Sequence, residues 1–346
     1  MDIETSQQPT AVAKVLAPPS CVNNLPGIGA CLGIALVAAW LGAWLPLIGG
    51  AVFAILLGIL VGNIWRMAPV TKPGITFCSK KVLQAAIVAL GGGLSLGQVW
   101  HTGRESLVVM LVTLSTALLA AFLIGKLMRV HPTLATLVGV GTGICGGSAI
   151  AAVAPIIQAE DDDIAFAIST VFLFNVVAVV VFPLVGHLLH LSDTGFGIWA
   201  GTAINDTSSV VAAGYSYSQH AGEYATITKL ARTTMIVPIS LAFAVLMARK
   251  AKGTGHYQLT KVFPWFILAF LGAAILNTLG VLGPVVPGWC NTAGKFLIVI
   301  ALAGVGLGTN LRAMLKTGPR PILLGLAVWA VVALTSLGIQ ALASQW

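Results

Sequence analysis

Long apolar stretches separated by short polar connections run through the sequence from Gly27 to Ala343. Because a helix needs about 20 apolar residues to cross the hydrocarbon core of a bilayer, this pattern predicts about 11 transmembrane helices. The predicted spans are residues 27–46, 48–65, 82–100, 106–125, 134–157, 164–189, 195–213, 224–247, 263–282, 291–309 and 319–343. We therefore predict an all-α polytopic membrane protein, with residues 1–26 as a polar cytoplasmic tail and residues 27–346 as one membrane domain.

The composition agrees with a membrane protein, because 58% of the residues are hydrophobic and only 8% are charged, against about a quarter charged in soluble domains. The net charge of +8 does not indicate nucleic acid, since the cations fall in connections and form no continuous basic face. Basic connections mark the cytoplasmic side of a membrane. With the N-terminus inside, the basic connections, including the one with Lys72, Lys80 and Lys81, all face the cytoplasm. Only Arg104 then faces out, and the C-terminus lies outside.

One acidic residue lies within a predicted span. All the others fall in the tail or in predicted connections: Asp2, Glu4, Glu105, Glu160, Asp161, Asp162, Asp163, Asp193 and Glu223. The exception is Asp206. An ionisable group at membrane depth costs roughly 2.5 to 3.5 kcal/mol on insertion scales, so it indicates a function by default. The alternative is that Asp206 lies near the end of its span, where water reaches it.

Two cations also lie at the start of an apolar span. Lys229 and Arg232 are three residues apart, so they share one face of a helix, and two cations on one face suit an anion. The alternative is that both extend to the outer surface from the first turns of this helix. Lys295 lies near the outer end of its span, where the same extension explains it.

Two glycine-rich polar motifs interrupt the apolar pattern: "GTGICGGSAIAAV" at 141–153 and "GTAINDTSSVVAAG" at 201–214. Scattered glycine lets helices pack closely in lipid. Clustered glycine followed by polar residues instead predicts a helix that breaks and restarts, which exposes backbone N–H groups that favour an anion. Transporters commonly build their sites from pairs of such discontinuous helices in two repeats. Crossing helices and re-entrant hairpins both remain open for these motifs.

The two motifs define a candidate anion site made of two half-sites. The first comprises Cys145, Gly146, Gly147, Ser148 and Ala149, and the second comprises Asn205, Asp206, Thr207 and Ser208. Lys229 or Arg232 would supply the countercharge. Asp206, with Asn205, would carry the coupling H⁺ or Na⁺.

A second internal similarity links "KVLQAAIVALGGGLSLGQVW" at 81–100 with "KFLIVIALAGVGLGTNLRAM" at 295–314. In the predicted topology these spans run in opposite directions, as in an inverted repeat. In the same predicted topology, the spans that contain the two glycine motifs run in the same direction. One of them is then re-entrant, or their similarity is convergent.

The glycine motifs, with "ATITKLAR" at 225–232 and "AILLGILVGN" at 54–63, resemble the YeiH family of bacterial inner-membrane proteins, catalogued as sulfate exporters. The resemblance extends over nearly the whole chain. It implies a fold similar to bile-acid symporters and sodium/proton antiporters, with interleaved core and scaffold subdomains, and an anionic substrate. In an inner membrane, the C-terminus that the charge pattern places outside would be periplasmic. Where family members often carry a His-Glu pair, this chain has Asn205 and Asp206, so its substrate or coupling ion is expected to differ.

These observations favour a secondary transporter of a small anion, such as a sulfur oxyanion or sulfonate, with an elevator-like mechanism coupled to H⁺ or Na⁺. The expected partners are the anion, the lipid bilayer and a second copy of the chain as a homodimer; no cofactor is expected. A passive anion channel is the alternative. An intramembrane enzyme is less favoured, because all six histidines fall in connections or at span ends and show no metal-ligand spacing.

Overall fold

The computed structural model describes residues 24–45, 49–65, 68–250, 265–312 and 318–346, and every regular element in these ranges is helical. Residues 1–23 of the predicted tail lie outside the described part. The first helix already begins at Leu25, so the last two residues of that predicted tail are helical. Pro26 stands in the first turn of this helix, where proline is tolerated because the N–H that it lacks has no partner there.

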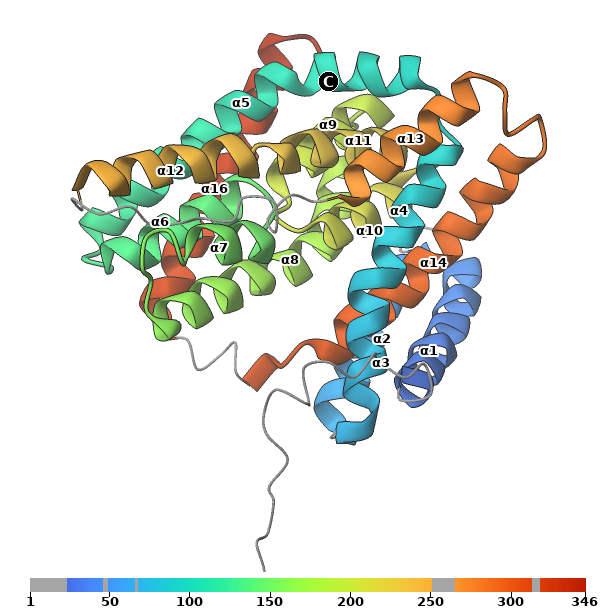
Figure 1. The fold of residues 1–346 in the computed structure, drawn as a ribbon, viewed down its shortest axis with the longest axis horizontal. Coiled ribbons are helices and arrows are strands. Elements are labelled where there is room, and N and C mark those ends of the chain that lie inside the picture. Colours follow the sequence, from blue (N-terminus) through green and yellow to red (C-terminus); the bar gives the residue numbers. More distant parts are fainter. Residues whose placement is uncertain (1–23, 46–48, 66–67, 251–264, 313–317) are drawn as a thin grey trace, which may run out of the picture.

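The helices follow the predicted apolar spans in most places (Figure 1). Their bounds are α1 Leu25–Trp44, α2 Gly49–Ile64, α3 Lys72–Phe77, α4 Leu83–Gly92, α5 Leu96–Leu127, α6 Pro132–Gly143, α7 Gly147–Val153, α8 Asp161–Leu188, α9 Asp193–Ala203, α10 Thr207–Tyr217, α11 Gln219–Thr234, α12 Ile236–Lys250, α13 Phe266–Thr278, α14 Val286–Gly308 and α16 Pro319–Leu342. A short 3-10 turn, Pro69–Thr71, precedes α3, and a π-helical turn, Cys78–Val82, joins α3 to α4.

The predicted boundary between the third and fourth spans is wrong. One helical run ends at Gly92 and the next begins at Leu96, so the predicted span 82–100 joins parts of two helices. Ser95 marks the true boundary through a capping box with Gln98. Apolarity continues across the glycines before Ser95, and hydropathy therefore does not reveal this boundary.

Several charges that were predicted to lie in connections are instead helical residues. The cations are Lys72, Lys80, Lys81, Arg104, Lys126, Arg249, Lys250 and Arg320, and the acidic residues are Glu105, Asp161, Asp162, Asp163, Asp193 and Glu223. The three aspartates and Asp193 stand in first turns, where the helix dipole favours negative charge. Charged residues therefore extend the helices beyond their apolar segments.

Seven helical runs in the described part are long and apolar enough to cross a membrane, and α2 and α13 are shorter apolar helices. The protein is thus consistent with a polytopic membrane protein. The predicted number of about 11 transmembrane helices is not confirmed. Two of the predicted spans are helices that break in the middle: one consists of α6 and α7, the other of α9 and α10.

The helices form two packed groups. The first helix group comprises α5–α12 and α16, and most of these share one apolar core; the second comprises α1–α4 and α14, with α13 packed against α4. Figure 1 shows the second group on the right and the first group on the left. Helices α8 and α10 lie between them, because Val179, Val211 and Ala212 belong to the core of the second group.

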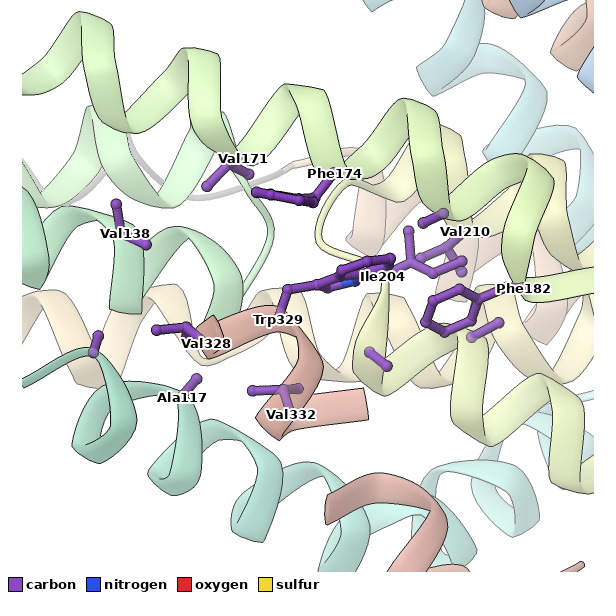
Figure 2. Packing of buried hydrophobic residues seen from close by; sticks show 14 of the residues in the cluster. Ala117, Val138, Val171, Phe174, Phe182, Ile204, Val210, Val328, Trp329 and Val332 are labelled. Atoms are coloured by element: carbon purple, nitrogen blue, oxygen red, sulfur yellow. The ribbon is translucent and has the colours of Figure 1, made fainter. Parts of the chain in front are cut away.

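Aromatic side chains fill the centre of the first group (Figure 2). Phe182 stacks on Trp199 with ring centroids 4.1 Å apart, and Phe174 stacks on Trp329 at 5.4 Å. The indole of Trp199 donates to the carbonyl of Ala333 at 3.1 Å. These contacts fix α16 against α8 and α9, and so support the interrupted helices from one side.

Glycines bring the helices of the second group into close backbone contact. A Cβ at Gly306 would lie 2.4 Å from the carbonyl oxygen of Ile55 and 2.9 Å from the Cα of Gly58. Helices α4 and α14, which belong to the similar segments 81–100 and 295–314, also pack on each other. Gly294, the residue before the second segment, packs against Leu90, and Gly304 packs against Cys78 in the π-helical turn before α4. Residue numbers that rise along one helix thus pair with residue numbers that fall along the other, so α4 and α14 run antiparallel. The inverted repeat itself stays a prediction.

Candidate functional site

The first glycine motif interrupts a helix at residues 144–146. Helix α6 ends at Gly143 and α7 begins at Gly147. Gly146 has φ +71° and ψ −131°, a conformation that residues with a side chain rarely adopt. Glycine in this motif therefore permits the backbone conformation at which the helix breaks.

The second motif interrupts another helix at residues 204–206. Helix α9 ends at Ala203, and α10 begins at Thr207 with Asp206 as its N-cap. The Asp206 carboxylate accepts from the backbone N–H of Ser208 at 2.9 Å and from the Ser208 hydroxyl. Charge at this position thus stabilises the restart of the helix.

The two interruptions meet inside the first helix group. A Cβ built on Gly146 would lie 3.6 Å from the Cβ of Asp206 and 3.7 Å from the carbonyl oxygen of Asn205. We refer to residues 142–149 and 202–208 as the crossing. Two segments that are far apart in the sequence therefore form one polar region.

Lys229 of α11 connects both interruptions. Its ammonium donates to the carbonyl of Ile144 at 2.8 Å and to the carbonyl of Ile204 at 2.9 Å. These carbonyls lie at the C-terminal ends of α6 and α9, where each helix dipole places about half a negative charge. One lysine thus compensates two helix ends.

Arg232 lies one helical turn further along α11 and holds the first interruption alone. Its Nε donates to the carbonyl of Gly143 at 2.6 Å, and its Nη2 donates to the carbonyl of Thr142 at 2.5 Å. Both Lys229 and Arg232 have 0% exposure. The alternative in which these two side chains extend to the outer surface therefore does not describe this structure.

Asn175 of α8 binds the crossing through its side chain, and the sequence interpretation missed it. Its Oδ1 accepts from the backbone N–H groups of Asn205 at 3.2 Å and Asp206 at 3.0 Å. It is 2% exposed. Its one signal in the sequence is an isolated amide within the apolar run "VFLFNVVAVV" at 171–180.

Several polar atoms in or beside the crossing are buried without a hydrogen-bond partner among the described residues. They are Asn175 Nδ2, Asn205 Oδ1, Thr228 Oγ1 and Arg232 Nη1. Leaving one such group unsatisfied costs about 1 to 3 kcal/mol. A small polar ligand or water at the crossing would supply these partners.

The structure brings most of the candidate site residues together, but not all in the same way. Gly146, Asn205, Asp206 and both cations converge at the crossing. Within the crossing, Cys145, Ala149, Thr207 and Ser208 are buried, Ser148 is exposed, and Gly147 and Asp206 are partly exposed. Access from outside the protein is therefore open to the Ser148 and Asp206 side, while the cations lie deeper.

Metal ligation by side chains has little support at the crossing. In the described ranges no group of three or more His, Cys, Asp or Glu side chains is placed to hold a metal ion. Asp206 is the one carboxylate of the crossing, and one of its oxygens already binds Ser208. A cation here would have to rely on amide and carbonyl oxygens for its other ligands.

Comparison with known proteins gives matches over almost the whole chain. Residues 26–325 match the protein family described as conserved hypothetical protein 698. A UPF0324 membrane protein of Streptococcus agalactiae is 42% identical over 336 residues, which cover 94% of this chain and 99% of that protein. UPF0324 membrane proteins of Streptococcus pyogenes and Streptococcus mutans are each 46% identical, again over 94% of this chain and over 99% and 98% of theirs. The resemblance to the YeiH family is consistent with these matches.

Proposed function

Starting from the fact that this chain belongs to the conserved hypothetical protein 698 family, we propose that it is a secondary transporter of a small anion. Its relatives are named as membrane proteins, which supports a role in the bilayer. We further propose a multi-pass place in a bacterial inner membrane, with the N-terminus cytoplasmic and the C-terminus periplasmic. A transport role is preferred to an enzymatic one.

The observation that carries this proposal is the pair of fully buried cations at the crossing. Formal charges are two positive, on Lys229 and Arg232, and one negative, on Asp206. Each interruption also joins the negative end of one helix to the positive end of the next, so the helix dipoles nearly cancel. The crossing thus has an excess of one positive charge while Asp206 is ionised, and of two once Asp206 has bound a proton or Na⁺; a monovalent or a divalent anion, respectively, would neutralise this excess.

Asp206 provides a way to couple the anion to a cation. Its Cβ lies beside Gly146 and its carboxylate is partly exposed, so an anion that approaches the cations from this side meets a negative charge first. Proton or Na⁺ binding to the carboxylate would remove that repulsion. The proposed order is therefore cation first, with Asn205 assisting, and then the anion, for example a sulfur oxyanion or sulfonate.

Asp206→Asn in proteoliposomes tests this role. We expect gradient-driven accumulation of the transported anion to be abolished, because the amide cannot take up a proton and lacks the negative charge that attracts Na⁺, while the unfolding temperature stays within about 4 °C of the wild type. The panel comprises sulfite, sulfate, small sulfonates and small carboxylates, each with and without Na⁺ and across pH. Asp193→Asn, in the first turn of α9, is the matched control and should transport normally.

Unchanged accumulation by the Asp206→Asn variant would disprove the coupling role. Flux that never saturates with substrate and ignores imposed ion gradients would instead support a passive anion channel. A binding screen by thermal stabilisation on the same anions identifies the substrate before the transport assay.

A further inference from the structure

A cavity of about 230 Å³ lies where the two helix groups meet, away from the crossing. Its walls come from α10 and α11 of the first group and from α2 and α14 of the second. The polar lining consists of Tyr215, Ser216, Gln219 and Lys295. The cavity is smaller than typical sites for drug-sized ligands, and suits a small ion with a few waters.

Lys295 gives this cavity a positive charge without a counterion. Its ammonium lies 5.8 Å from the centre of the Tyr215 ring, so the side chain reaches across to the other helix group and not simply outward. In the described part of the chain, no carboxylate lies within 4 Å of this ammonium. Lys295 is an exposed residue, and its ammonium meets an aromatic face, a contact that contributes about 0.5 to 1 kcal/mol at exposed sites. Its charge therefore remains available to an anion in the cavity.

The neighbouring polar groups complete an anion-binding environment. The Tyr215 hydroxyl makes no hydrogen bond to any described residue, so it is available as a donor. Gly50 and Ala51, in the first turn of α2, also line the cavity, and the start of a helix favours negative charge. The nearby carboxylate of Glu223 accepts from Gln219 at 2.5 Å and lines a separate cavity.

We propose that this cavity is a second anion site, which binds a small oxyanion between Lys295 and the Tyr215 hydroxyl. Because these residues belong to different helix groups, the bound oxyanion bridges the two groups. Lys295, which the sequence interpretation explained by extension to the outer surface, thereby acquires a ligand. The site does not depend on the transport function proposed for the crossing.

The test is direct binding of ³⁵S-sulfate and ³²P-phosphate to the purified full chain, with chloride keeping the ionic strength constant. We expect Lys295→Gln to weaken a saturable binding component about tenfold or more, because it removes a charge-assisted contact. Tyr215→Phe should weaken the same component by a smaller factor. Lys81→Gln is the matched control, since Lys81 begins the similar segment 81–100, is exposed and lines none of the described cavity.

Asp206→Asn separates this site from the crossing. The Lys295-dependent component should persist in that variant, whether or not transport is lost. The proposal is overturned if neither oxyanion shows saturable binding to the wild type, or if Lys295→Gln binds both as the wild type does while remaining monodisperse and folded. Equal weakening by Lys81→Gln would also overturn it, because the effect would then reflect general surface charge.

Discussion

Lys229 and Arg232 are buried cations whose hydrogen-bond partners are main-chain carbonyls. Hydrogen bonds that involve a charged group contribute about 1.5 to 3 kcal/mol each, which offsets part of the large cost of removing a cation from water. Both side chains therefore have a structural role in holding helix ends, in addition to the electrostatic role proposed for them. Two donors of this pair remain available to a ligand: the Nη1 of Arg232, which has no partner among the described residues, and the third N–H of the Lys229 ammonium.

Lys229→Met should destabilise the protein by about 2 kcal/mol or more, because it leaves the carbonyls of Ile144 and Ile204 buried without a donor. The measurement is thermal unfolding of the purified protein in detergent. Lys72→Met, which removes an exposed helical cation, should leave the unfolding temperature unchanged. Equal unfolding temperatures for the two variants would contradict the role assigned to Lys229.

Among single residues, the sequence identifies some members of the site and not others. Asp206, Lys229 and Arg232 are recognisable because charge at membrane depth is costly and therefore rare. Asn175 is not, since a neutral amide costs much less and carries a weaker signal. The partners of the cations were also unpredictable, because every residue has a backbone carbonyl and no residue type marks those that are left free.

Glycine has two different functions in the helices of this protein. At Gly146 it permits a positive φ at the break between α6 and α7, whereas at Gly58 and Gly306 it permits the backbones of α2 and α14 to touch. The first use locates the crossing, and the second fixes α2 against α14. Both uses appear in the sequence as the same residue in an apolar run.

A pair of substitutions two residues apart in α14 tests the second use. Gly306→Ala should lower the free energy of unfolding by about 1 to 3 kcal/mol, because the new Cβ would lie 2.4 Å from the carbonyl oxygen of Ile55 and force α2 away. Gly308→Ala meets its nearest neighbouring atom at 4.0 Å and should be neutral. Denaturation in a detergent series compares the two variants, and equal stabilities would exclude close packing as the reason for Gly306.

The sequence predicts helical segments better than it predicts their ends. Apolar runs of sufficient length locate nearly all the helices, because the requirement to satisfy backbone groups in lipid leaves few alternatives. The end of α4 and the start of α5 were missed, since the local signal is one serine cap within a glycine-rich run. The breaks at 144–146 and 204–206 coincide with the glycine motifs, because polar residues and clustered glycine both disfavour a continuous helix there.

The two helix groups meet mainly along α10, and smaller contacts are made by α8 with α2 and by α11 with α4 and α13. Helix α10 contributes Asp206 to the crossing at its start, and it places Val211 and Ala212 in the core of the second group. The same helix places Val210 and Ala213 in the core of the first group. If the crossing moves relative to the second group during transport, α10 is the surface over which that movement takes place.

Ala212→Leu and Ala213→Leu compare the contact between the groups with the interior of one group. Ala212→Leu should slow transport strongly with little loss of stability, because the larger side chain obstructs sliding but can be relieved by a small separation of the groups. Ala213→Leu should cost about 1 to 3 kcal/mol of stability, since its surroundings belong to one packed core. The measurements are the transport rate per folded protein and the unfolding temperature of each variant. If both quantities change equally in the two variants, α10 is not a surface over which the groups slide.

The division into two groups was not predictable from hydropathy. Lipid-facing and buried residues are similarly apolar in a membrane protein, so the pattern does not reveal which helix packs on which. The contact between α4 and α14 joins parts of the chain that are some two hundred residues apart. Internal similarity between segments 81–100 and 295–314 was the one sequence signal that related them.

Lys229 leaves little freedom between the two interruptions that it joins. Its ammonium lies within 2.9 Å of both acceptors, and a hydrogen bond weakens once such a distance exceeds about 3.5 Å. A relative displacement of the two helix ends that stretches either distance beyond this limit would break one bond. Any ligand held at the crossing would therefore move together with both interruptions and α11 as one rigid unit.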